Sequence, residues 1–254
     1  MNVSLRHTGK KIEHLFDKFR GSSIAILGSG PTLLDHSSEI QKSDIVIACN
    51  GSLMGIDTEI PIDYFVCVDK ASPFRQWFYR SCIFSNKENS PVTRVLPPYI
   101  LAFDEIALPH EVSRRSLQRQ LSRFEETLLD EEDYSGFKPI IPYEHLNGVT
   151  YNLDNWDPEL ESRGITSGKG TITGFASQLA FKMGADEVRL FGCGFSNSDG
   201  RTYAYDNGNE PGITTNKQAQ NMDNILQALI HRRRSLRVVS YGKTALQVPD
   251  VIYR

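Results

Sequence analysis

Residues 23–32 read SIAILGSGPT, and this stretch decides the predicted fold. Its first half is a short apolar run, which is typical of a parallel strand buried on both faces. Gly28 and Gly30 then permit a tight turn, and Pro31 suits the first turn of a helix because its missing N–H is not needed there. The stretch therefore predicts a strand, a glycine turn and a helix over about 32–42.

Predicted strands and helices continue to alternate along the chain. Further strands are predicted at apolar runs, at 44–49, 64–68, 92–96, 187–191 and 236–241. Helices are predicted where apolar or small residues recur at helical spacing, at 110–129, 171–183 and 217–231. Strands that alternate with helices form right-handed crossovers and a parallel sheet. The predicted fold class is α/β, with a Rossmann-like, open, mostly parallel sheet and helices on both faces.

The domain organisation is predicted to be simple. Residues 1–22 form an N-terminal helical extension, because 8–20 carry an apolar stripe flanked by lysines. That helix packs on the core or, in the alternative, contacts a membrane surface or a partner. Residues 23–254 form a nucleotide-binding α/β domain. Within it, residues 195–216 are rich in Gly, Asn, Asp and Ser, which predicts a small lid.

Composition excludes several classes of protein. The 254 residues carry 28 Lys and Arg against 31 Asp and Glu, a net charge of −3, which argues against a nucleic-acid partner because phosphate backbones attract basic surfaces. The four cysteines form no CxxC pair and are interpreted as buried apolar side chains. No signal-like segment or long apolar run is visible, so we expect a cytoplasmic protein.

Candidate binding residues follow from the strand ends. Ligands of open parallel sheets bind beyond the carboxyl ends of the strands. There the sequence places Gly28-Ser29-Gly30, Asn50, Asp69 and Gly192. A glycine turn before a helix N-terminus offers N–H groups and a positive dipole to a phosphate. The turn is neither a dinucleotide fingerprint nor a P-loop, so a purely structural turn stays open.

Markers of other chemistries do not occur in the sequence. It has no Gly-x-Ser-x-Gly elbow, no HExxH helix and no Asp-x-Asp pair. The usual signatures of hydrolases and of metal-dependent sugar transferases are therefore missing, and no metal site is predicted.

Three blocks of sequence resemble the bacterial sialyltransferases that decorate lipooligosaccharide using CMP-sialic acid. The first is Ile26 to Leu33, with the Gly-x-Gly-Pro turn, and the second is the strand ending at Cys49-Asn50. The third runs from Ile165-Thr166-Ser167-Gly168 through Gly192 to Tyr203-Ala204-Tyr205-Asp206. Together the blocks cover about a third of the chain. The glycine start and the late strand-glycine motif are also similar to archaeal 6-hydroxymethylpterin diphosphokinase-like proteins.

The resemblance implies a glycosyltransferase. It would move a sialic acid- or Kdo-like sugar from a CMP-activated donor to a hydroxyl of a glycan or lipo-oligosaccharide acceptor, with inversion and without a metal or cofactor. The nucleotide and donor would be surrounded by Gly28, Ser29, Gly30, Asn50, Asp69, Thr166, Ser167, Gly168 and Gly192. Tyr203 would lie in the lid and donate a hydrogen bond to the leaving phosphate. The resemblance also implies a homo-oligomer and allows a peripheral contact with the inner face of the membrane.

The chain departs from the family at one catalytic position. The family carries a catalytic histidine between the lid and the last helix, where this chain has residues 212–217 without histidine. A general base must lie within hydrogen-bond reach of the acceptor hydroxyl, and Asp206 or Asp69 is the expected substitute. Two alternatives remain open at this point: a diphosphokinase-like phosphoryl transferase, and a non-catalytic protein that binds a nucleotide or glycan.

Overall fold

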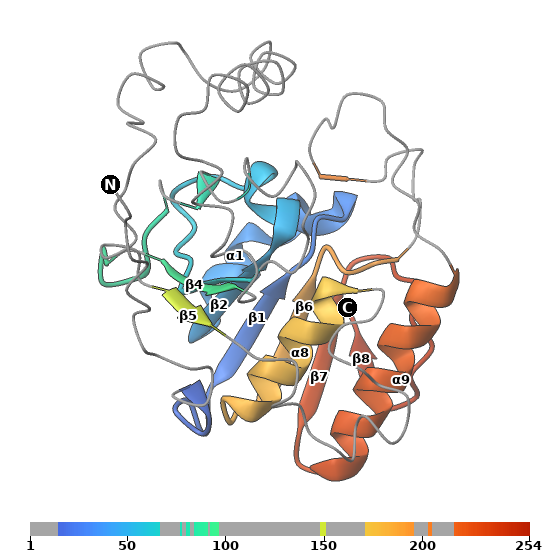
Figure 1. The fold of residues 1–254 in the computed structure, drawn as a ribbon. Coiled ribbons are helices and arrows are strands. Elements are labelled where there is room, and N and C mark those ends of the chain that lie inside the picture. The colour runs from blue at the N-terminus through green and yellow to red at the C-terminus, as the bar shows by residue number, and fades with distance from the viewer. Residues whose placement is uncertain are drawn as a thin grey trace, which may run out of the picture.

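The computed structural model describes residues 15–66, 77, 80–81, 84–90, 92–96, 148–150, 171–195, 203–204 and 216–254. Their strands form one eight-stranded sheet in the order β5-β4-β3-β2-β1-β6-β7-β8, and every neighbouring pair is parallel. The predicted α/β, Rossmann-like fold class is confirmed (Figure 1).

The first half of the sheet follows the predicted pattern closely. Its strands are β1 (Ser23–Leu27), β2 (Ile45–Cys49), β3 (Tyr64–Val66), β4 (Thr93–Leu96) and β5 (Gly148–Thr150). β1 to β4 coincide with predicted apolar runs. β5 is not among the predicted strands, because three residues are too short a run to show a strand period.

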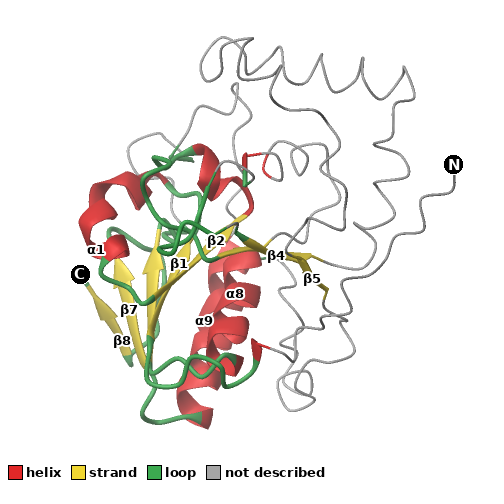
Figure 2. Cartoon of the chain, turned by 90° about the vertical axis from the view of Figure 1, so that its left-hand side faces the viewer, coloured by secondary structure: helices red, strands yellow, loops and turns green. Residues whose placement is uncertain are grey.

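The second half adds β6 (Glu187–Phe191), β7 (Arg237–Tyr241) and β8 (Val251–Tyr253), with the long helices α8 (Ile172–Lys182) and α9 (Asn216–Arg232). All but β8 were predicted within one or two residues. Figure 2 shows α8 and α9 on one side of the strands and α1 (Ser37–Gln41) on the other. Among the described helices, none has the length and apolar character needed to cross a membrane.

The helix predicted over 32–42 is corrected by the structure. A 3-10 helix, η2, covers Pro31–His36, and the α-helix α1 follows from Ser37. Leu33 is fully buried against the sheet. Its Cβ lies 3.0 Å from the position that a Cβ on Gly192 would take. This close contact with the end of β6 holds the turn tight.

Two layers of core side chains lie on the two faces of the sheet. One face buries Ile24, Ile26 and Leu190 against α8 and α9. The other buries Leu27, Phe65 and Phe191 beneath η2 and the 3-10 helix η3 (Asn50–Met54). Successive strand residues alternate between the two faces, as a sheet covered on both sides requires.

Arg233 lies at the carboxyl end of α8, close to the start of β6. Arg233 follows α9 within the basic run 232–234, and its side chain is anchored. Its guanidinium donates hydrogen bonds to the carbonyls of Ala185 (2.7 Å) and Phe181 (3.1 Å), and it lies 4.4 Å from the centroid of the Phe181 ring. Arg233 therefore caps the carboxyl end of α8.

The predicted N-terminal extension is described only from Leu15 onward. Residues 16–21 form turns and not the helix predicted over 8–20. They lie at the carboxyl end of α8, where the N–H of Asp17 is donated to Lys182 O and the N–H of Phe19 to Met183 O, both at 2.8 Å. Residues 1–14 lie outside the described part of the chain, so a helix there stays a prediction.

Candidate nucleotide site at the sheet switch point

The chain changes direction across the sheet between β1 and β6. From β1 it moves outward through β2 to β5, and it returns to place β6 on the other side of β1. In open parallel sheets, ligands bind at this switch point, in the crevice beyond the carboxyl ends of the two strands. Gly28, Ser29 and Gly30 follow β1, and Gly192 follows β6. The structure thus brings four predicted site residues together at the expected place.

The glycines at these two strand ends are in backbone contact. Gly28 donates its N–H to Phe191 O, and Gly30 donates its N–H to Gly192 O, both at 2.8 Å. A Cβ on Gly28 would lie 2.5 Å from Gly192 O. Gly192 has a φ of +61°, a conformation that favours glycine. No side chain fits between the two turns.

This contact changes the role expected of Gly28 and Gly30. Both N–H groups hold β1 and β6 together, so neither is available to a phosphate. η2 begins at Pro31, which has no N–H, and it spans only six residues. The glycine turn therefore lets a ligand approach the backbone closely. Because η2 is short, its dipole adds only a small positive charge at this turn.

A longer helix begins at the same edge of the sheet. α8 runs antiparallel to the strands, packs on β1, β2 and β6, and begins after Thr171. Thr171 makes no capping hydrogen bond; its Oγ1 lies 2.7 Å from Thr173 Oγ1 instead. The first turn of α8 contains no acidic residue that would offset the helix dipole. The positive end of this dipole therefore faces the carboxyl ends of the strands. The small residues of 171–183 predict this helix, but its N-terminus was not among the predicted binding residues.

Asn50 lies at the carboxyl end of β2, two strands from β6. Its φ is +47°, a left-handed conformation that asparagine tolerates better than most residues. Just before it, the N–H of Cys49 is donated to Ser52 Oγ at 3.0 Å, and Ser52 is fully buried. The turn into η3 therefore sets the backbone of Asn50 rigidly at the edge. Backbone outliers of this kind cluster at ligand sites.

Tyr203 and Ala204, which belong to the predicted lid, lie against these strand ends. Ala204 donates its N–H to Ser29 O at 2.8 Å. A Cβ on Gly55, just after η3, would lie 2.8 Å from Ala204 Cβ. Tyr203 is half-buried beside this contact. The structure thus joins Ser29 to the Tyr203-Ala204 segment, and the lid itself stays a prediction.

The remaining predicted site residues cannot be placed in the same way. Asp69, Thr166, Ser167, Gly168 and Asp206 lie outside the described residues. Their roles stay predictions.

Two titratable side chains lie close to the strand ends. Burial raises the pKa of the Cys193 thiol to about 12, and its Sγ lies 3.3 Å from Phe191 O, so it is a structural thiol and not a nucleophile. His36 packs against Phe191 and Tyr241, with ring centroids 6.3 and 5.6 Å away. His36 does not follow a strand in the sequence, but η2 folds back to place it at these strand ends, on the face opposite α8.

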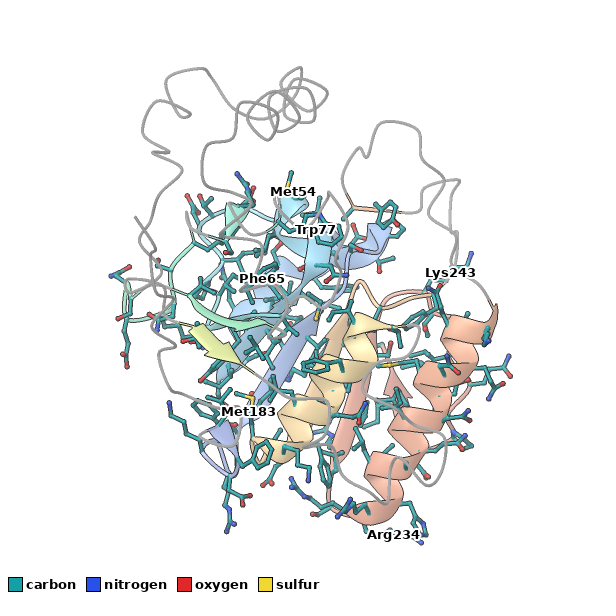
Figure 3. All side chains as sticks on the ribbon, in the orientation of Figure 1. Met54, Phe65, Trp77, Met183, Arg234 and Lys243 are labelled. Carbon is teal, nitrogen blue, oxygen red and sulfur yellow. The ribbon has the colours of Figure 1, made fainter. Side chains whose placement is uncertain are left out.

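In Figure 3, Met54, Trp77 and Lys243 mark the carboxyl edge of the sheet, where the candidate site lies, and Met183 and Arg234 mark the amino edge. In the described part of the chain, no group of three or more His, Cys, Asp or Glu side chains is placed to hold a metal ion.

Solved structures resemble this chain at the level of the fold. Neither a family model nor a curated protein matches the chain. Among solved structures, the Maf glycosyltransferase from Magnetospirillum magneticum is similar over 96% of this chain, with a TM-score of 0.52 and 14% identity. This chain spans 37% of the length of that protein.

A second similar structure is the monofunctional α-2,3-sialyltransferase Cst-I from Campylobacter jejuni. It matches 86% of this chain and 75% of its own, with a TM-score of 0.50 and 12% identity. At such identities the likeness concerns the fold, an α/β sheet that two glycosyltransferases share with this chain.

Proposed function

We propose that this chain is a glycosyltransferase that moves a sialic acid- or Kdo-like sugar from a CMP-activated donor to a hydroxyl of a glycan acceptor. The observation that carries the proposal is the backbone contact at the switch point, where the Gly28–Gly30 turn meets Gly192 and Ser29 O accepts the N–H of Ala204. The fold likeness to two glycosyltransferases supports the class of enzyme. The sequence blocks around Thr166 and Tyr203 support a CMP-activated donor.

The proposed chemistry uses fixed dipoles in place of a metal. The nucleotide lies beyond β1 and β6, and its phosphate faces the positive end of α8. The acceptor oxygen attacks the anomeric carbon opposite the leaving group; a C–O bond forms as the bond to the CMP oxygen breaks, with inversion. A base, Asp206 or Asp69, takes the acceptor proton. The Tyr203 hydroxyl donates to the leaving phosphate, where the hydrogen bond strengthens as charge develops.

Nucleotide binding is the first test. Thermal unfolding is followed with CMP, UDP, GDP and ATP, each with and without Mg²⁺. A ligand at a hundred times its Kd stabilises the fold by about 2.7 kcal/mol, which moves the melting temperature by several degrees. We expect a shift with CMP that does not need Mg²⁺. A shift confined to ATP with Mg²⁺ would replace the proposal with a phosphoryl transferase, and no shift with any nucleotide would end it.

Asn50 and Asn89 provide a matched pair of variants for that test. Both have a left-handed φ, +47° and +56°, so alanine introduces similar backbone strain at each. Asn50 lies at the candidate site, and Asn89 lies in an exposed turn before β4. We expect Asn50→Ala to weaken CMP binding about tenfold, or ~1.4 kcal/mol, and Asn89→Ala to leave it unchanged. Equal effects would place the nucleotide elsewhere.

Turnover separates the enzyme from a binding protein. CMP release is measured with CMP-sialic acid and CMP-Kdo in the presence of glycan or lipo-oligosaccharide acceptors. We expect Tyr203→Phe to lower kcat by about ten- to a hundredfold and to leave the Kd for CMP nearly constant, because the lost hydrogen bond strengthens in the transition state. Tight CMP binding without turnover on any acceptor would favour the non-catalytic alternative.

A further inference from the structure

The strand β8 lies at one edge of the described sheet. It pairs with β7 through Val238 and Val251, Val239 and Ile252, and Ser240 and Tyr253, and no further described strand lies beyond it (Figure 2). Ile252 and Tyr253 are 39% and 44% exposed, and they are two of only three large apolar side chains exposed in the described residues. Within the described part of the chain, β8 is therefore an edge strand with two exposed apolar side chains.

Hydrogen bonds to β7 fix the direction of the backbone groups of β8. Arg254 donates its N–H to Ser240 O at 2.9 Å and accepts from the N–H of Gly242 at 2.7 Å, so its polar groups face β7. Along a strand, the backbone N–H and C=O groups of successive residues point alternately to one side of the strand and to the other. Ile252 then also faces β7, and Val251 and Tyr253 direct their carbonyls outward. The N–H of Tyr253 points outward as well, while that of Val251 is donated back to Val248 O at 3.1 Å.

Edge strands of this kind pair readily with another strand. Natural proteins limit such pairing with very short edge strands, or with a lysine, a proline or a bulge within the strand. β8 is a short strand, but its residues 251–253 include no lysine or proline. The geometry points to a second copy of this chain as the occupant: two β8 strands pair antiparallel across a twofold axis through Ile252, and the two sheets become one continuous sheet.

The sequence of this edge is complementary to itself in that register. Around a twofold axis at Ile252, Asp250 of each copy lies opposite Arg254 of the other, and Tyr253 lies opposite Val251. Both Asp250 and Arg254 are exposed. A parallel pairing in register would place Asp250 beside Asp250, which repels. The two charge pairs therefore favour the antiparallel, isologous dimer.

The backbone pattern agrees with the same axis. Because the polar groups of Ile252 face β7, the two Ile252 residues form a non-hydrogen-bonded pair, the kind that brings side chains closest, with Cα atoms about 4.5 Å apart. Tyr253 of each copy donates its N–H to Val251 O of the other. Two exposed isoleucines become buried against each other, and the dimer forms independently of any nucleotide or sugar.

The first test measures the mass of the full chain in solution by light scattering and by sedimentation over a range of concentrations. We expect a dimer, and we expect Ile252→Lys to raise the dimer dissociation constant at least a hundredfold, because two lysines would face each other on the axis. Leu34→Lys is the control, since Leu34 is 45% exposed on η2. A monomer at every concentration, or a dimer that Ile252→Lys leaves intact, would overturn the inference.

The second test uses charge reversal. Asp250→Arg alone and Arg254→Asp alone each place like charges across the axis twice, so each variant is expected to be monomeric. Mixed together they restore both opposite-charge pairs, and a heterodimer is expected. Glu59→Arg, at an exposed position outside β8, controls for a general effect of charge. A mixture that stays monomeric would contradict this register, and unchanged melting temperatures show that the variants are folded.

Discussion

Gly30 donates its backbone N–H to the carbonyl oxygen of Gly192 at 2.8 Å, and a Cβ on Gly30 would lie 2.6 Å from the same oxygen. This bond joins two residues that lie 162 positions apart in the chain, at the end of β1 and the end of β6. It explains why both turns carry glycine. Backbone hydrogen bonds thus join the two turns of the switch point directly.

Gly192→Ala is expected to destabilise the fold by about 2–4 kcal/mol. The substitution combines the cost of a left-handed alanine with a Cβ placed 2.6 Å from Gly28 O. Gly21→Ala is the control: Gly21 has a φ of +81°, but a Cβ there meets no atom within 4 Å, so only about 1–2 kcal/mol is expected. Urea unfolding measures both. Equal losses would show that the contact with Gly28 contributes nothing.

Gly55→Ala is expected to disturb the lid more than the fold. Gly55 has an ordinary φ of −105°, so alanine adds no backbone strain, but its Cβ would lie 2.8 Å from Ala204 Cβ. The Tyr203-Ala204 segment must then move away from Ser29. Calorimetric titration should show CMP affinity reduced about tenfold, or ~1.4 kcal/mol, with a nearly unchanged melting temperature. Unchanged affinity would place the segment outside the binding site.

Arg233→Ala is expected to cost about 2–3 kcal/mol of the free energy of unfolding, because two carbonyls at the end of α8 lose charged donors and the Phe181 ring loses its cation. Arg234→Ala is the matched control, since Arg234 is exposed, and a change within about 0.5 kcal/mol is expected. Chemical denaturation of the two variants compares them directly. Similar losses in both would point to overall charge as the cause.

Asp223→Asn is expected to change how stability depends on pH. Burial raises the pKa of the Asp223 carboxyl, whose Oδ1 accepts the N–H of Gln247 at 3.1 Å. A folded pKa above the unfolded value gives stability that is fully present below the unfolded pKa, about 3.9, and is lost as pH rises through the folded pKa. Asn keeps an acceptor for Gln247 and cannot ionise.

The stability of Asp223→Asn relative to the natural chain should therefore increase as pH rises through that window and then level off. Denaturant unfolding at a series of pH values from 3.5 to 8, buffered at constant ionic strength, measures the difference. A difference that does not vary with pH would show that the carboxyl titrates alike in the folded and unfolded chain.

The sequence by itself determined the α/β class, the order of most strands and the residues that gather at the switch point. Apolar runs such as Ile24 to Leu27 are hydrophobic enough to be buried on both faces, and glycine after a strand marks a turn with no room for a side chain. These signals are local, because each depends on only a few neighbouring residues. The sequence therefore predicts that Gly28, Gly30, Asn50 and Gly192 lie at the carboxyl ends of strands.

Only the tertiary structure decided what those residues do. The N–H groups of Gly28 and Gly30 bond to carbonyls of a strand that comes more than 160 residues later, and no local pattern encodes that pairing. The same holds for His36 against Tyr241, for Arg233 at the end of α8 and for the short strands β5 and β8. Each depends on which distant backbone lies alongside, because hydrogen bonds and packing act between neighbours in space and not in sequence.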